Sequence, residues 1–211
     1  MKKISTNRLF VALVLAVVAA LATPTVLRYV AAESVPAMKV GVAASDVQVM
    51  QSQLVAGSSS STVTLLNATI HTTNPEDVQF SVTAECSIVT SGDLSGISTV
   101  VTKATVTIWV EVDGVPVQVS PAQGDDGRVV FCNRDWQLDL ADPGGFLGMY
   151  EKTKSANAFN WMLQNVGAGT HSIVVKGQLA VFVTGVGTAQ AGVGRRTLIA
   201  EPAHLTNDAT F

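Results

Sequence analysis

Residues 78–88 read VQFSVTAECSI, a stretch in which apolar and polar residues alternate without a break. Because successive side chains of a β-strand point to opposite faces of a sheet, the stretch predicts a strand with one packed face and one face in water. The packed set comprises Val78, Phe80, Val82, Ala84, Cys86 and Ile88. Cys86 is therefore expected in the core.

The same period of two recurs along most of the remaining chain and predicts further strands over residues 103–113, 128–138, 171–183 and 188–201, with a shorter alternation over 159–163. The inward set of the first is Ala104, Val106, Ile108, Val110 and Val112. In the second, shared parity places Val130, Cys132, Trp136 and Leu138 on one face. After the N-terminal segment, the only helical structure expected is a short turn around residues 146–153.

Turn residues separate these runs. Asp113 and Gly114 stand between two alternating runs and predict a type I′ hairpin, because both central residues of that turn need a positive φ. Pro116 in the returning run has no backbone N–H, which predicts a short or edge strand. Gly177 interrupts the strand 171–183 and indicates a bulge or a close backbone approach.

Strands divided by Gly, Pro, Asn and Asp turns predict an all-β fold: an antiparallel β-sandwich of jelly-roll or immunoglobulin-like type over residues 62–211. The composition agrees, since hydrophobic residues make up 47% of the chain and charged residues 14%. Residues 33–61 are predicted to hold an N-terminal strand segment, followed at 57–61 (GSSSS) by a flexible linker or surface loop.

The first 32 residues resemble an export signal. Lys2, Lys3 and Arg8 precede an apolar run over residues 9–22, which is the arrangement of a secretory signal peptide and its helix. The alternative is an uncleaved anchor, although the run is shorter than the roughly 20 residues that span a bilayer. The prediction is a secreted or cell-envelope protein that contacts a membrane only through this segment, if it is not cleaved.

The charge of the predicted mature part argues against one class of partner. From Glu33 onward, nine Lys and Arg face sixteen Asp and Glu, a formal charge of about −7. Nucleic acid is not expected as a partner, because affinity for it depends on neutralising phosphates with Lys and Arg. The expected partners are a protein or glycan at the cell surface, or another copy of the chain.

Cys86 and Cys132 are the only cysteines. An even pair in an exported chain predicts a disulfide, and both positions face the core, so the bond is expected to join the two sheets. Trp136 is expected nearby as core filling. Free thiols in a reducing compartment would conflict with the export signal, and two separated cysteines lack the ligand count for zinc.

Two sets of residues are candidate sites. Asp125, Asp126 and Asp142 are conceivable calcium ligands, because extracellular β domains often hold this cation between loops; the alternative is solvated turn carboxylates. No other cofactor is expected. Trp109 lies on the outward parity of its strand, where an aromatic ring can stack on a sugar or anchor a partner, unless a loop or second sheet covers it.

Three segments carry a resemblance: residues 113–117 (DGVPV), 165–176 (NVGAGTHSIVVK) and 194–201 (GRRTLIAE). Together they resemble uncharacterised exported bacterial sandwich proteins and the jelly-roll modules of surface and fibre proteins. The resemblance covers the C-terminal half and rests on hairpin and turn residues. It implies a fold and an extracellular setting, and transfers no functional residue.

Two functions of different class follow. The first is a non-catalytic secreted or cell-envelope protein with a structural, adhesive or ligand-binding role, in which residues 38–55 could complete a neighbouring molecule's sheet as a donated strand. The alternative is an extracellular hydrolase or calcium-dependent enzyme on a jelly-roll scaffold, with His171 or His204 and acidic partners lining a cleft. The absence of a Gly-x-Ser-x-Gly motif and of metal-spaced histidines favours the non-catalytic protein.

Overall fold

The computed structural model describes residues 41–94, 99–119, 124–139 and 146–203. Strand β4, Glu76–Asp93, contains the alternating stretch and extends it at both ends. Every residue of the predicted packed set is buried, and the residues between them line the outer face. The alternation that predicted the strand therefore also placed its two faces correctly.

All regular structure within the described ranges is β. The other strands are β1 (Gly41–Ser45), β2 (Val49–Gln53), β3 (Gly57–Thr72), β5 (Thr99–Val112), β6 (Val115–Pro116), β7 (Val129–Asp139), β8 (Gly148–Val166), β9 (Gly169–Thr184) and β10 (Val186–Ala203). In the same ranges, no helix has the length and apolar character needed to cross a membrane. The predicted signal segment and its helix lie outside the described residues.

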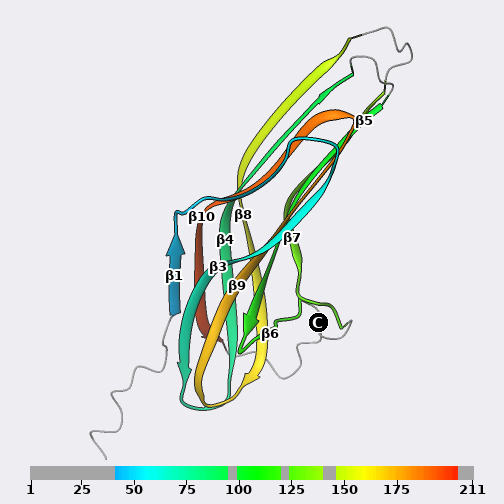
Figure 1. Cartoon of the computed structure of the whole chain (residues 1–211). Coiled ribbons are helices and arrows are strands. Elements are labelled where there is room, and N and C mark those ends of the chain that lie inside the picture. The colour runs from blue at the N-terminus through cyan, green and yellow to red at the C-terminus, as the bar shows by residue number, and fades with distance from the viewer. Residues whose placement is uncertain (1–40, 95–98, 120–123, 140–145, 204–211) are drawn as a thin grey trace, which may run out of the picture. The chain divides into compact units, whose positions relative to one another are not determined.

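The strands form two antiparallel sheets (Figure 1). One has the order β1-β10-β4-β8, with β2 also pairing β10; the other has the order β3-β9-β5-β6, with β7 also pairing β5. With β1 and β2 counted as one broken strand, and β6 and β7 as another, the first strand pairs the last, the second the seventh, the third the sixth and the fourth the fifth. This nested pairing is the jelly-roll arrangement, so it decides between the two predicted sandwich types.

Three local predictions differ from the structure. Residues 148–153 belong to β8 and pair β4 instead of forming a helical turn, and residues 57–61 belong to β3 and pair β9 instead of forming a loop. In both places the partner strand, which sequence periodicity does not report, determines the backbone. Val130 is exposed because the register of β7 against β5 shifts between Cys132 and Val130, which turns Phe131 inward in its place.

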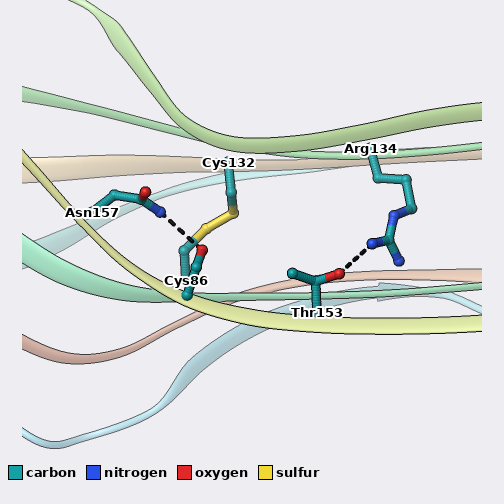
Figure 2. The surroundings of a disulfide bond; sticks show 6 residues. Cys86, Cys132, Arg134, Thr153 and Asn157 are labelled. Atoms are coloured by element: carbon teal, nitrogen blue, oxygen red, sulfur yellow. Dashed lines mark hydrogen bonds between the residues drawn. A yellow bond between two sulfur atoms is a disulfide. The ribbon is translucent and has the colours of Figure 1, made fainter.

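The predicted hairpin and the predicted disulfide are both confirmed. Asp113 and Gly114 have φ values of 51° and 84°, as a type I′ turn requires. Cys86 of β4 is bonded to Cys132 of β7, with their Cα atoms 6.3 Å apart, so the bond joins the two sheets (Figure 2). The indole Nε1 of Trp136 donates to the Thr90 hydroxyl at 2.8 Å, which also ties β7 to β4.

Arg134 strengthens the same side of the sandwich. It extends from β7 toward β8, where it donates to the Thr153 hydroxyl (Figure 2). It also pairs with the Glu151 carboxylate at 3.2 Å. Strands β7 and β8 are edge strands of different sheets. The disulfide and this arginine therefore hold together an edge of the sandwich that no main-chain pairing closes.

Two bulges interrupt the ladders. In β3 the register shifts between Thr64 and Leu66, and the extra residue, Leu65, packs against Gly177 of β9. A Cβ atom at Gly177 would lie 2.8 Å from the Leu65 side chain, so the predicted close approach is present and the bulge is in the partner strand. In β10 the register against β4 shifts between Val193 and Arg196.

The second bulge turns the side chain of Arg196 into the core. There its Nε donates to the Leu65 carbonyl at 3.0 Å, and its Nη1 donates to the carbonyls of Val47 at 2.6 Å and Gly194 at 2.9 Å. Burial lowers the pKa of Arg196 below its ordinary value, although the nearby charge of Asp46 opposes the shift. One guanidinium thus binds carbonyls from both bulges and from the β1–β2 corner.

Candidate binding groove

A groove of about 590 Å³ lies at one end of the sheet β1-β10-β4-β8. Its lining comes from the end of β4, the start of β8, the start of β10 with the turn before it, and the turn after β2. Register aligns three of the lining residues, because Ser91 of β4 is the partner of Tyr150 of β8 and of Thr188 of β10. The groove therefore runs across strands and joins residues far apart in sequence.

The floor of the groove is polar and closely supported. The hydroxyl oxygens of Ser91 and Thr188 are 2.7 Å apart and share a hydrogen bond. A Cβ atom at Gly187 would lie 2.5 Å from the Ser91 carbonyl oxygen, so only glycine permits this approach. A Cβ atom at Gly92 would lie 2.5 Å from the ring of Trp136, which packs beneath the floor.

The rim of the groove is apolar. Tyr150 is 67% exposed on one side, Val55 is 69% exposed on the other, and Val186 is 54% exposed at the end. Leu54 and Met149 are also exposed and line the groove. Large apolar side chains gathered in one exposed place are typical of a surface that contacts a ligand or partner.

The lining residues offer recognition chemistry rather than reaction chemistry. Within the described part of the chain they include no Lys, Arg, His or Cys, and Asp93 is the only acidic one. The Ser91 hydroxyl bonds the Thr188 hydroxyl, so it does not face a base that could take its proton. The groove is suited to hold a molecule by stacking, apolar contact and hydrogen bonds from hydroxyl and backbone groups.

Trp109, the predicted ligand-binding residue, lies elsewhere, on the outer face of the other sheet. It is only 3% exposed, because the Arg128 guanidinium lies 4.0 Å from its ring centroid. Its Nε1 donates to Glu111 at 2.9 Å, and Glu111 pairs Lys176 at 2.8 Å. Burial raises the pKa of Glu111. The hydrogen bonds from Lys176 and Trp109 outweigh this effect, so the pKa of Glu111 lies below its ordinary value. The predicted binding role stays a prediction, and it requires Arg128 to move aside.

The predicted calcium ligands shape a loop in the structure. The Oδ1 atom of Asp125 accepts the backbone N–H groups of Val119 and Gly127, both at 2.8 Å. Asp126 pairs the Arg128 side chain at 3.0 Å. Asp142 lies outside the described residues, and within the described part of the chain no three acidic, His or Cys side chains gather as a metal site. Calcium binding stays a prediction.

His171 has an acidic partner, as the alternative enzyme hypothesis requires. Its Nδ1 lies 2.7 Å from the Asp113 carboxylate and its Nε2 lies 2.8 Å from the Gly167 carbonyl oxygen. Both neighbours accept hydrogen bonds, so only the protonated ring satisfies both. The arrangement joins the β5–β6 hairpin to the β8–β9 turn and leaves neither ring nitrogen free to act as a base. His204 lies outside the described residues.

This pair predicts a pH-dependent stability. The bonds to Asp113 and Gly167 raise the pKa of His171, and the bonds from His171 and the Ser172 N–H lower the pKa of Asp113. The histidine contribution is complete below the ordinary pKa of about 6.5 and is lost as pH rises through the raised value; the aspartate contribution is lost as pH falls through the lowered value. Stability from the pair is therefore greatest between about pH 4 and 6.5.

We expect thermal unfolding of the wild type to show a loss of stability between pH 5.5 and 8.5 that is larger, by up to about 1 kcal/mol, than the loss in His171→Gln. The variant serves as the control for every other titrating group. The effect is small because the Asp113 carboxylate is half exposed. An equal pH dependence in the two proteins would exclude the ion pair as a source of stability.

Sequence reasoning did not predict the groove. Tyr150 falls in the region predicted as a helical turn, and Val55 ends the segment 38–55 predicted as a donated strand, so neither residue was expected to line a groove. The available signal was the run of large apolar residues Phe146, Leu147, Met149 and Tyr150 directly after a turn-rich loop. In an edge strand such a run has no core to enter.

No protein-family model and no curated protein matches the chain. Solved structures with a β-sandwich or jelly-roll fold are weakly similar. The structure of infectious bursal disease virus Gx strain is 16% identical, with 81% of this chain and 37% of that chain covered and a TM-score of 0.26. The chain thus spans little more than a third of that viral chain.

Two carbohydrate-binding modules are similar at the same weak level. CBM4 is 9% identical, with 65% of this chain and 60% of that chain covered and a TM-score of 0.17. TmCBM61, solved in complex with β-1,4-galactotriose, is 12% identical, with 76% and 86% covered and a TM-score of 0.19.

Proposed function

We propose that this chain is a non-catalytic jelly-roll protein that works outside the cytoplasm, and that it binds its partner through the groove. The observation that carries the proposal is the lining: an exposed apolar rim around a hydroxyl-bearing floor, whose described residues include no cation and no nucleophile paired to a base. Such a site holds a ligand without reacting with it.

The rest of the molecule supports this assignment. The disulfide between the sheets suits an oxidising compartment, where a bond of this kind persists. The negative formal charge, −3 for the whole chain and about −7 from Glu33 onward, favours solubility and disfavours phosphate-rich partners. Self-association by strand donation is the second candidate. It is supported by β1 and β2, which contribute no fully buried residue and pair β10 at its edge.

The test places charge on the rim. In Val55→Asp/Val186→Asp, retention of the purified protein on the cell-envelope fraction of its own organism is expected to fall at least tenfold, because each carboxylate must be desolvated in the complex. Val115 and Val130 are exposed to 66% and 54%, which closely matches the rim valines, so Val115→Asp/Val130→Asp is the control and is expected to bind like the wild type.

Light scattering of the same three proteins separates the two candidates. A monomer whose envelope binding depends on the rim supports the groove. A wild-type oligomer that persists in the rim variant supports strand donation. Equal envelope retention of rim and control variants contradicts a binding role for the groove.

A further inference from the structure

We infer that the ligand of the groove is an uncharged saccharide chain of at least two units, laid across β8, β4 and β10. This inference rests on the proposed function and adds the chemical class of the ligand. It follows from four features of the groove: an exposed aromatic ring, a polar floor, the charge of the lining, and the line of residues that crosses the strands from Tyr150 through Ser91 to Thr188.

The aromatic feature is Tyr150. Its side chain is two-thirds exposed at the rim and stands in register with the hydroxyl of Ser91 in the floor. An exposed aromatic ring gives an apolar face, and its phenol gives a polar edge. The C–H face of a pyranose ring has the complementary character, with apolar carbon on its faces and hydroxyls around its edge. Tyr150 is thus the stacking platform.

The floor provides the polar partners. Each hydroxyl of Ser91 and Thr188 can donate and accept, as each sugar hydroxyl can, and Asp93 lies one row further along the same strand as Ser91. An apolar peptide seated in the groove would leave these two hydroxyls bonded only to each other, whereas a sugar hydroxyl can use the donor and acceptor positions that remain. The polar floor therefore favours a polyhydroxylated ligand over an apolar peptide, although the rim alone would suit both.

The charge of the lining excludes acidic sugars. Among the described residues that line the groove, Asp93 is the only charged one, so a sulfate, phosphate or uronate group would meet repulsion and no cationic partner from this lining. A smaller hollow of about 330 Å³ on the other sheet is lined by Lys103 and Phe182, but the Lys103 ammonium pairs with Asp135 at 2.7 Å. The charge of the lining therefore favours an uncharged chain in the groove.

The direction of the row sets the length. Tyr150, Ser91 and Thr188 lie on three neighbouring strands, so the row spans about 10 Å. The groove continues past Thr188 to Leu54 and Val55 at the opposite rim. A single sugar on Tyr150 would leave that part of the groove unfilled, whereas an oligosaccharide occupies both.

The chain has two tyrosines, Tyr29 and Tyr150, which makes the platform directly observable. Full-length protein labelled with 3-fluorotyrosine gives two fluorine resonances, and the one lost in Tyr150→Phe belongs to Tyr150. The probes are the neutral cello-, xylo-, manno-, malto- and galactotetraoses, with tetragalacturonate as the acidic counterpart. At least one neutral probe is expected to shift the Tyr150 resonance alone, and tetragalacturonate is expected to shift neither.

Variants then divide the contributions. For the neutral probe that binds, Tyr150→Ala is expected to weaken affinity measured by calorimetry at least tenfold, and Ser91→Ala/Thr188→Val about fivefold to tenfold. Phe182→Ala, an aromatic control on the other sheet, is expected to leave it unchanged. Tyr150 is exposed, so its replacement does not disturb folding, and unchanged thermal unfolding verifies this.

Four results would overturn the inference: no neutral probe shifts the Tyr150 resonance, tetragalacturonate binds more tightly, Tyr150→Ala binds as well as the wild type, or Phe182→Ala alone loses binding. If the rim aspartates abolish envelope retention while every saccharide fails, the inference is wrong and the proposed function stands. If the rim aspartates also have no effect, both fail.

Discussion

Replacement of Arg196 by methionine is expected to lower the free energy of unfolding by about 3–5 kcal/mol. Methionine fills much of the same volume, so the loss reports the guanidinium and not a cavity. The guanidinium holds the carbonyls of Leu65, Val47 and Gly194, and two of these three hydrogen bonds are buried.

The size of this effect comes from where the three carbonyls lie. Leu65 is the extra residue of the β3 bulge, Gly194 belongs to the β10 bulge, and Val47 lies in the corner between β1 and β2. None of these three residues is paired with a residue of a neighbouring strand. Without Arg196 the oxygens of Leu65 and Gly194 would stay buried and unpaired, and the part-buried oxygen of Val47 would lose its partner.

The neighbouring residue provides a matched control. Arg195 is exposed, so Arg195→Met is expected to change stability by less than about 0.5 kcal/mol in denaturant unfolding. Arg196→Lys keeps the charge but has no planar fork to reach three carbonyls, and it is expected to fall between methionine and the wild type. A loss below about 1 kcal/mol in Arg196→Met would show that water or a backbone shift satisfies the bulges.

Removal of the disulfide is expected to cost about 4 kcal/mol, because the bond closes a loop of 46 residues and restricts the unfolded chain. The double variant Cys86→Ala/Cys132→Ala isolates this effect. Its denaturation midpoint should fall relative to the oxidised wild type and should not respond to a thiol reductant. Reduced wild type should match it.

Loss of the disulfide is expected to lower stability without opening the sandwich. Arg134 of β7 reaches the opposite sheet through Thr153 and Glu151 of β8, so this side of the sandwich stays partly closed when the bond between β7 and β4 is lost. The expected result is therefore a less stable fold with unchanged sheets by circular dichroism. A wild type whose midpoint is insensitive to reductant would contradict the chain-entropy argument.

Much of the fold could be predicted from the sequence because long central strands alternate cleanly. The predicted inward residues of β4 and β5 are buried, and the Asp113-Gly114 turn has the predicted backbone. The predictions failed where apolar and polar residues do not alternate. The serines of residues 57–61 and the mixed run 148–153 become strands only because β9 and β4 pair with them.

The disulfide could be predicted from the two cysteines and the strand face on which each lies. The groove and the contacts of Arg196 with three carbonyls could not. A bulge reverses side-chain parity after it, so the inward direction of Arg196 is invisible until the extra residue in β10 is located. Tyr150 likewise needs the knowledge that β8 is an edge strand. Both depend on which strands become neighbours, and periodicity does not encode this.

The pairing of the first strand with the last also governs when the molecule can form. Strand β10 lies between β4 on one side and β1 and β2 on the other, and Gly41 faces Ala200 in the ladder. The centre of that sheet is therefore the last of the described strands to be synthesised. Folding of the sandwich is a late event, slowed by contacts between distant residues, and a fragment that lacks β10 leaves β1 and β2 without a strand to pair.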